Sequence, residues 1–192
     1  MTETSDEELL MAYQRGNPAA FATLFARYRI PLFNFILRWT HDRGRAEELY
    51  QDTWTKVIER CDAFRGEAKF STWLYSIARN TCIDHQRRMK LRRHRSLDAP
   101  MTDGQDPMVA RVPADAPETD ELANAATLRH RITLAVEALP SDQREVFLLR
   151  QLQGMRFAEI ADVAGVSENT AKSRMRYALE RIRLELGDLR EP

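Results

Sequence analysis

The stretch FAEIADVAGVSENTAKSRMRYALERIR, residues 157–183, decides the fold of the C-terminal part of the chain. Its apolar residues recur at three- and four-residue steps on both sides of the segment AGVS, as they do in amphipathic helices. Gly165 and a buried Val166 suit a turn between two helices, and Ser167 suits the N-cap of the second helix. We therefore predict a helix-turn-helix, with a short helix over residues 157–163 and a longer one over residues 168–186.

The longer helix has two distinct faces. At about 100° per residue, one side collects the apolar residues Ala171, Met175, Ala178, Leu179 and Ile182. The opposite side collects Asn169, Lys172, Ser173 and Arg176, with Arg174 and Arg181 on its flanks. Such donors and acceptors suit base edges in the major groove, and flanking arginines suit phosphates. A basic face on an arbitrary helix is more often only solvated, but the turn in front of this one favours DNA binding.

Towards the N-terminus, the chain changes character twice. Apolar residues form a helical stripe from residue 128 to 139 that Pro140 ends, and Ser141 is expected to cap the next helix, which stops near Gly154. Before them, residues 97–121 contain four prolines, many acidic and small residues and no apolar period. This composition is typical of a solvated linker, so we place a domain boundary there.

The first part of the chain is also predicted to be helical. Helices are expected over residues 5–15, over residues 21–39 with a kink at Pro31, over residues 46–61, and from Ser71 as N-cap through the basic cluster at residues 85–95. Strand-like alternation is not seen. We predict an all-α protein of two small helical domains, residues 1–96 and 122–192, joined by a flexible acidic linker, residues 97–121.

Residues 64–95, FRGEAKFSTWLYSIARNTCIDHQRRMKLRRHR, interleave aromatic and basic side chains. Residues 64–70 are predicted to form a loop entering the helix, and this loop carries Phe64, Arg65, Lys69 and Phe70. Along the helix, one stripe carries Trp73, Asn80, Asp84 and Arg87. Aromatic rings stack on unpaired bases and arginines follow the backbone, so the strip has the groups needed to hold single-stranded DNA or a flipped base. The pattern fits equally well with aromatic residues in a core and arginines at a solvated helix end.

Composition and charge exclude several classes of protein. The 192 residues carry 29 basic and 29 acidic side chains, and two distant cysteines predict neither a disulfide framework nor a metal pair. No signal peptide or membrane span is expected, which favours a soluble cytoplasmic protein without membrane insertion. Catalytic triads, HExxH and phosphate-loop motifs are not found and the four histidines are scattered, so we expect no enzyme, no cofactor and no metal site.

Three of these segments, taken together, resemble one known family, the extracytoplasmic-function (group IV) sigma factors of bacterial RNA polymerase. AEELYQDTWTKVIE, residues 46–59, resembles the core-binding helix of region two. FSTWLYSIARNTCIDHQRR, residues 70–88, resembles the segment that recognises and melts the minus-ten element. Residues 139–183 resemble region four. The three motifs occur in the family's order and cover nearly the whole chain except the linker and the tails.

The resemblance implies a role for each motif. Leu49, Gln51 and Asp52 match positions that grip the coiled coil of the largest polymerase subunit. Residues 64–70 match the loop that captures a flipped minus-ten base, with Asn80 lining the pocket and Arg87 and Arg88 on the DNA backbone. Lys172, Ser173, Arg176 and Tyr177 match positions that read the minus-thirty-five element. The expected partners are the polymerase core, promoter DNA both as duplex and as melted strand, and an anti-sigma factor.

One alternative comes from another class of protein. A free-standing helix-turn-helix regulator would bind duplex operators without polymerase, and it would need a ligand-binding, phosphoacceptor or dimerisation module. The first domain contains no such module that the sequence identifies. Without the resemblance, the acidic face of residues 48–59 is more simply explained as an ordinary solvated helix face.

Overall fold

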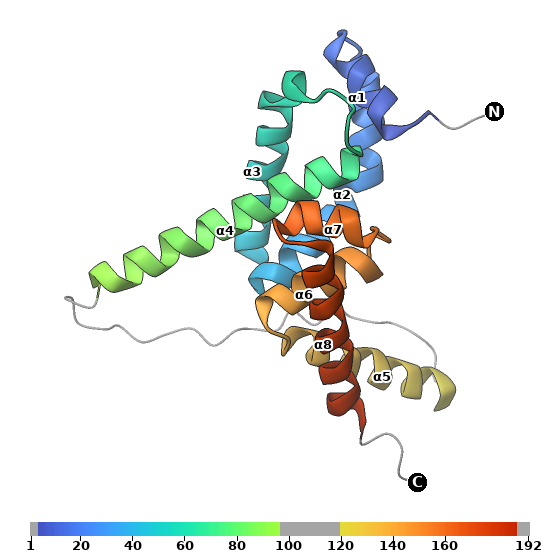
Figure 1. The fold of residues 1–192 in the computed structure, drawn as a ribbon, viewed down its shortest axis with the longest axis vertical. Coiled ribbons are helices and arrows are strands. Elements are labelled where there is room, and N and C mark those ends of the chain that lie inside the picture. The colour runs from blue at the N-terminus through green and yellow to red at the C-terminus, as the bar shows by residue number, and fades with distance from the viewer. Residues whose placement is uncertain (1–3, 97–119, 188–192) are drawn as a thin grey trace. The chain divides into compact units, whose positions relative to one another are not determined.

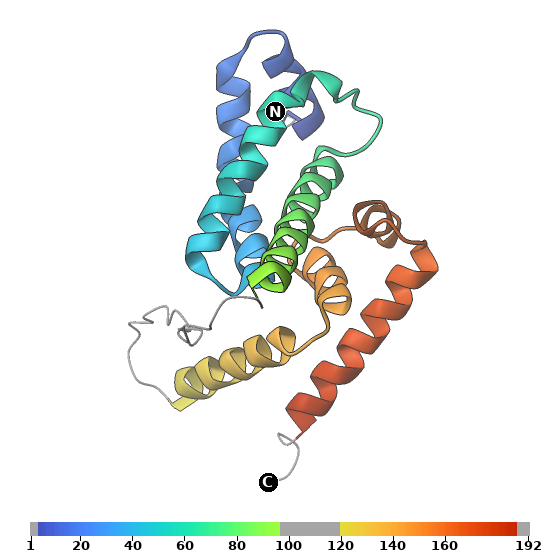
Figure 2. The same cartoon turned by 90° about the vertical axis from the view of Figure 1, so that its left-hand side faces the viewer.

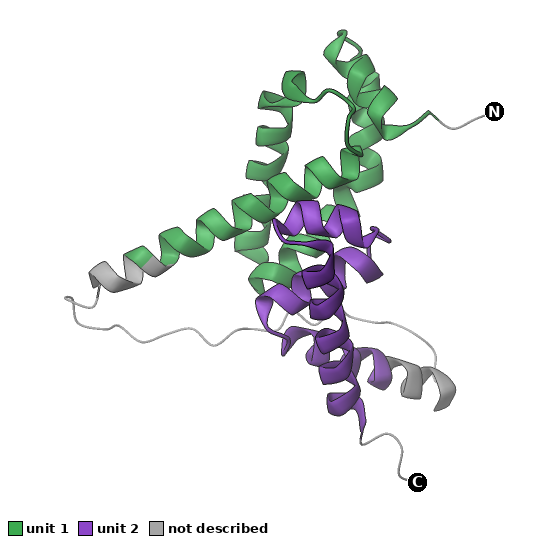
Figure 3. Cartoon of the chain, in the orientation of Figure 1, with its two compact units in different colours: residues 1–109 green, residues 110–192 purple. Residues whose placement is uncertain are grey.

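The computed structural model describes residues 4–96 and 120–187, and every element within those ranges is a helix. The chain divides into two compact units, residues 1–109 and residues 110–192 (Figure 3). The division falls inside the predicted linker, most of which, residues 97–119, lies outside the described residues. The all-α prediction is confirmed for the described residues, and the first helix of the second unit begins at Asp120.

The first unit contains four α-helices and a short 3-10 helix. They are α1 (Asp6–Gln14), α2 (Pro18–Thr40), α3 (Arg43–Glu59), η1 (Cys61–Ala63) and α4 (Phe70–Ser96). Helix α2 packs against α1, α3 and α4, and α3 also packs against α4 (Figures 1 and 2). Pro31 lies inside α2, which continues through it to Thr40.

The core of this unit forms where the inner faces of α2, α3 and α4 meet. The Phe35 ring of α2 stands edge-on against Tyr75 of α4, with ring centroids 5.2 Å apart, and both side chains are fully buried. The core also contains Leu24, Leu32 and Ile36 from α2 and Leu49 and Val57 from α3, together with Leu74, Ala78 and Cys82 from α4. This burial fixes which face of each helix remains for a partner.

Two details of the first unit differ from the predictions. Ile58 follows the apolar period of α3, yet its side chain is exposed, whereas the polar Thr53 is buried and donates a hydrogen bond to the Leu49 carbonyl at 2.7 Å. Ser71 is not the N-cap of α4, since the helix begins one residue earlier. The Phe70 N–H donates instead to a carboxylate oxygen of Glu7, at 2.7 Å, from a distant helix.

The second unit contains α5 (Asp120–Glu137), α6 (Ser141–Gln151), α7 (Phe157–Ala164) and α8 (Glu168–Leu186). Helix α8 packs against the other three. Its buried residues are Ala171, Met175, Ala178 and Ile182, as predicted, whereas Leu179 is 42% exposed. Ser141 is the first residue of α6 rather than its cap, because Pro140 occupies the cap position without a side-chain hydrogen bond.

We expect Phe35→Ala to lower the free energy of unfolding of the chain by about 3–5 kcal/mol, because it opens a cavity at the centre of the first unit. The matched control is Phe33→Ala on the same helix. The Phe33 ring is half-buried, and its centroid lies 5.7 Å from that of the Tyr50 ring. We expect the control to cost clearly less. Urea unfolding of the two variants tests this, and equal losses would contradict the assignment of the core.

Candidate nucleic-acid interface

The turn between α7 and α8 has the geometry of a helix-turn-helix. Helix α7 ends at Gly165, whose φ of 65° lies in the left-handed region that glycine enters without strain. The Val166 N–H donates to the Ala161 carbonyl at 3.1 Å, and the Ser167 hydroxyl accepts from the Thr170 N–H at 3.1 Å. The predicted N-cap is therefore confirmed, and the turn directs α8 away from α7 with its N-terminal residues at the surface.

The predicted recognition face of α8 is exposed. Asn169, Lys172, Ser173 and Arg176 all lie at the surface, because the small side chains of Ala171 and Ala178 face the other helices. The Arg176 guanidinium lies 5.0 Å from the centroid of the Tyr177 ring, and its Nη2 donates to the Tyr177 hydroxyl at 3.2 Å. A guanidinium stacked in this way is restrained before any ligand arrives, which lowers the entropy lost on binding.

Arg174 differs from the role predicted for it. Its Nε lies 3.1 Å from a carboxylate oxygen of Asp142 at the start of α6, and its side chain is mostly buried. Arg174 therefore joins α8 to α6 in the free chain, and its contact with a phosphate stays a prediction. Lys172 is also paired, with Glu168 one turn before it at 2.6 Å, but this pair is exposed and can exchange partners with little loss.

In the first unit, the aromatic residues of the predicted strip form one cluster. Phe64, Phe70 and Trp73 contact one another, with ring centroids between 5.3 and 6.4 Å apart. Phe70 is completely buried and Phe64 is 6% exposed, so little of either ring is open to solvent in the free chain. Trp73 is the half-exposed member of the three.

A cavity of about 180 Å³ opens beside this cluster. Residues 63–68 and Trp73 line it, so the 64–70 loop forms one wall and an indole ring the other. Arg65, Glu67 and Lys69 of the loop are exposed around it. An aromatic wall and a backbone wall suit a base taken out of its stack, and the charged residues of the lining, Arg65 and Glu67, are of opposite sign.

The exposed stripe of α4 extends away from this cavity. Asn80, Asp84, Arg87 and Arg88 are all exposed, and the Arg88 Nε donates to the Asp84 carbonyl at 3.3 Å. Asn80 is not among the residues that line this cavity, because it lies seven residues, or about 10 Å, further along the helix than Trp73. The role that the resemblance implies for Asn80 in the base pocket stays a prediction. The stripe suits a strand of DNA that leaves the cavity along α4.

The residues of α3 that are predicted to contact polymerase differ in their exposure. Gln51 is exposed and Asp52 half-exposed, beside the exposed Glu48 and Glu59. Leu49 is only 1% exposed, so its side chain belongs to the core. A Leu at this position instead holds the turn of α3 that displays Gln51 and Asp52.

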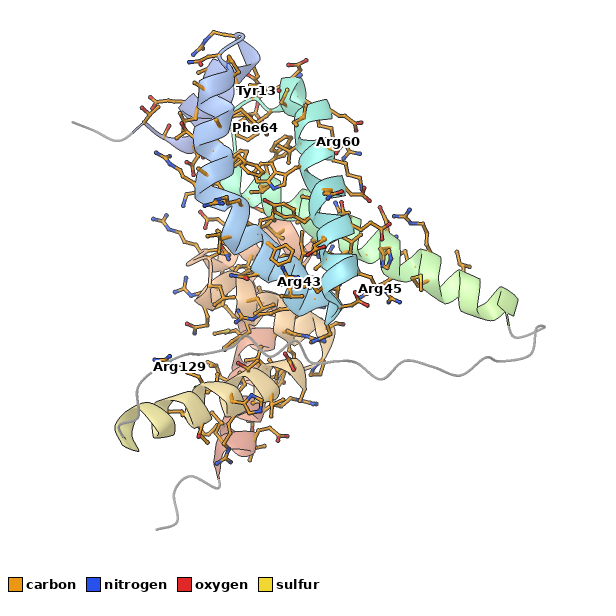
Figure 4. The ribbon with its side chains drawn as sticks, turned by 180° about the vertical axis from the view of Figure 1, so that it is seen from behind. Tyr13, Arg43, Arg45, Arg60, Phe64 and Arg129 are labelled. Carbon is orange, nitrogen blue, oxygen red and sulfur yellow. The ribbon has the colours of Figure 1, made fainter. Side chains whose placement is uncertain are left out.

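The sequence did not indicate how α1 participates in this site. Gln14 donates through its side-chain Nε2 to the carbonyls of Cys61 and Phe64, at 2.6 and 2.9 Å. Figure 4 labels Tyr13 of α1 and Phe64 at the same end of the unit, where α1 also packs against η1 and α4. Such contacts join residues about fifty positions apart, and no local pattern announces them.

No helix within residues 4–96 and 120–187 combines the length and apolar character needed to cross a membrane. In the same ranges, His, Cys, Asp and Glu side chains do not gather in groups of three or more that could hold a metal ion.

We expect Arg174 and Asp142 to be energetically coupled. A double-mutant cycle with Arg174→Ala and Asp142→Ala should give a coupling of about 0.2–1 kcal/mol in thermal unfolding, the range for partly exposed ion pairs. Arg181→Ala, an exposed arginine later on the same helix, provides the matched control and should show no coupling to Asp142. A coupling of zero for Arg174 would return it to the group of side chains available to phosphate.

Comparison with known proteins relates both units to one family. The family description Sigma-70 region 2 matches residues 24–92, and Sigma-70, region 4 matches residues 129–182. The RNA polymerase sigma-H factor of Pseudomonas aeruginosa is 31% identical over 192 residues, covering 95% of this chain and 94% of the relative. The ECF RNA polymerase sigma-E factor of Escherichia coli K12 is 28% identical over 180 residues, covering 94% and 93%.

Solved structures give the same result. The sigma factor RpoE, solved in complex with the anti-sigma factor NepR from Bartonella quintana, matches with a TM-score of 0.68 and 26% identity, covering 87% of this chain and 96% of the other. CnrH, solved in complex with the cytosolic domain of CnrY, shares the fold with a TM-score of 0.67 at 22% identity, covering 98% and 100%.

Proposed function

This chain belongs to the extracytoplasmic-function sigma factors of bacterial RNA polymerase, and from that premise we propose which residues carry each step of promoter recognition. A sigma factor binds core polymerase, directs it to specific promoters and promotes melting of the DNA. The observation that carries the assignment of steps is the pairing, in one chain, of an aromatic-lined cavity in the first unit with an exposed polar recognition face in the second.

The polymerase contact is assigned to the exposed face of α3. Gln51 presents an amide and Asp52 a carboxylate on a helix whose opposite side is buried. Glu48 and Glu59 add further negative charge to this face. Such a face complements a basic helical partner, and its charge steers association as well as fixing register. The Leu49 side chain supports this face from the core.

Melting of the minus-ten element is assigned to the cavity beside the 64–70 loop. A base leaving the duplex would enter between the loop backbone and Trp73, with Arg65 and Lys69 near its phosphate. The strand would then continue along the exposed stripe of α4, where Asn80 can read a base edge and Arg87 and Arg88 can follow the backbone. Phe64, which lines the cavity, and the completely buried Phe70 both pack against Trp73 and support it from the core.

Recognition of the minus-thirty-five element is assigned to α8. Asn169, Lys172, Ser173 and Arg176 are the side chains that would enter the major groove, and Tyr177 orients Arg176. Recognition of duplex DNA and capture of a melted base thus belong to separate units. Each can be tested without disabling the other.

Regulation and location complete the proposal. A structural relative was solved with an anti-sigma factor, and a partner of this kind would keep the DNA-binding and polymerase-binding faces covered until a signal arrives. We place the chain in the cytoplasm with the polymerase, as a specificity subunit that has no catalytic chemistry of its own. The predicted domain limits, residues 1–96 and 122–192, remain part of this proposal.

The function is tested by mixing the purified chain with bacterial core polymerase, followed by gel filtration and transcription from genomic fragments. We expect a stable complex that initiates at specific sites.

Asp52→Lys should weaken complex formation at least tenfold, about 1.4 kcal/mol, through charge reversal, while thermal unfolding is unchanged. Glu47→Lys, at an exposed site of α3 already paired with Arg43, is the control. Tight duplex binding by the chain without any core complex would favour a free-standing regulator.

Arg176→Ala is expected to reduce discrimination among upstream-element sequences by about 1–3 kcal/mol, the value of one bidentate contact to a base. Competition binding to a panel of single-base variants of the element measures it. Arg183→Ala, further along α8, should leave the discrimination intact. An equal loss on every sequence would instead identify Arg176 as a phosphate contact.

A further inference from the structure

Three residues on one face of α1 contact the beginning, the middle and the end of the segment that shapes the base-binding cavity. Glu7, Met11 and Gln14 are spaced by four and three positions, which places them on the same side of the helix. From this arrangement we propose that Glu7 and Gln14 are positioning residues that hold the 64–70 loop in the shape that accepts a flipped base. The inference rests on the function proposed above for that loop.

At the beginning of the segment, Gln14 uses both hydrogens of its side-chain amide. They bind the carbonyls of Cys61 and Phe64, which lie at either end of the turn formed by η1. The Cys61 carbonyl also accepts from the Phe64 N–H at 3.0 Å, so the turn and its support share an acceptor. Loss of the amide would leave the part-buried Phe64 carbonyl without this donor, at a cost that favours another loop conformation.

At the end of the segment, the carboxylate of Glu7 caps α4. The first N–H groups of a helix lack partners within the helix, and a negative charge there is favourable. Glu7 accepts from the Phe70 N–H at 2.7 Å and so fixes the residue at which the loop stops and α4 starts. The position of Trp73, one turn later, depends on that choice.

In the middle, Met11 packs against Gly66. Gly66 has a φ of 74°, and a Cβ built on it would meet the Cε of Met11. The loop backbone therefore lies against the end of the Met11 side chain, and a substitution at position 66 is opposed chiefly by backbone strain, because the flexible Met11 side chain can move aside.

Helix α1 is itself firmly attached. Its Asp6 carboxylate pairs with Arg27 and accepts a hydrogen bond from the Tyr28 hydroxyl, both on α2, and Leu10 is completely buried. Burial and the hydrogen bond to Asp6 raise the pKa of Tyr28 above its ordinary value. Ser5 and Glu8 close a capping box at the N-terminus of α1.

The cavity wall contains residues 63–68 and Trp73 but no residue of α1. Glu7 and Gln14 therefore act on a captured base only through the loop that they hold. Their contribution should be to the choice of base, because a loop free to take several shapes accommodates several bases. Affinity for the polymerase and for the upstream duplex element should not depend on them.

The test uses the full chain bound to core polymerase and a set of promoters carrying each of the four bases at each melted minus-ten position. Permanganate reactivity and a fluorescent base analogue report the rate of opening. Gln14→Met keeps the length of the side chain and removes its donors, and Arg15→Met, on the adjacent exposed residue, is the matched control. Glu7→Leu removes the acceptor at Phe70, and Glu7→Gln restores one.

We expect Gln14→Met and Glu7→Leu to reduce the preference for the best base over the worst, at the captured position, by roughly tenfold. Arg15→Met and Glu7→Gln should retain the preference, and all four should bind core polymerase normally. Thermal unfolding of each variant sets the assay temperature well below its transition. Slower opening by the same factor at every base, or an unchanged preference, overturns the inference. A wild-type chain that opens promoters without preference at any melted position would instead refute the base-capturing role of the loop.

Discussion

Burial of one face of α4 against α2 and α3 is the constraint on which the first unit depends. Phe35 and Tyr75 meet at its centre, and the stripe through Leu74, Ala78 and Cys82 continues the contact along the helix. Because this face of α4 is occupied by the core, residues on the other side of the helix face solvent. The exposed stripe with Asn80 and Arg87 is thus a consequence of core packing, and a variant that disturbs the core would also redirect the DNA-facing side chains.

The same helix connects the faces assigned to the two partners of the first unit. Lys56 of α3 donates to the Thr81 hydroxyl of α4 at 3.0 Å, and Thr81 in turn donates to the Ile77 carbonyl at 2.9 Å. A part-buried hydrogen bond of this kind restricts sliding between the polymerase-facing helix and the DNA-facing helix. Because α1 also contacts the 64–70 loop, the residues assigned to DNA binding in the first unit lie on elements that are held by contacts with neighbouring helices.

In the second unit, small side chains allow one helix to be buried on one face and to expose polar residues on the other. Ala171 and Ala178 allow α8 to lie close to its neighbours, so a single helix both closes the core and displays a polar face. Arg174 is drawn into the framework by Asp142, while Arg176 is restrained only by its neighbour Tyr177 and remains exposed. Two arginines separated by one residue therefore have different roles because of the partner that one of them finds on α6.

The sequence by itself determined the all-α class, the helix-turn-helix with its Gly165 turn and Ser167 cap, and the exposed residues Asn169, Lys172 and Arg176, because these follow from periodicity and local hydrogen bonding. Only the tertiary structure decided which aromatic residues are exposed to solvent, since Phe64 and Phe70 pack against Trp73 and are buried. It also placed the Leu49 side chain in the core, paired Arg174 with Asp142, and replaced the expected Ser71 cap with Glu7. Helical periodicity shows which residues share a face, but it carries no information on which distant helix will cover that face or satisfy its polar groups.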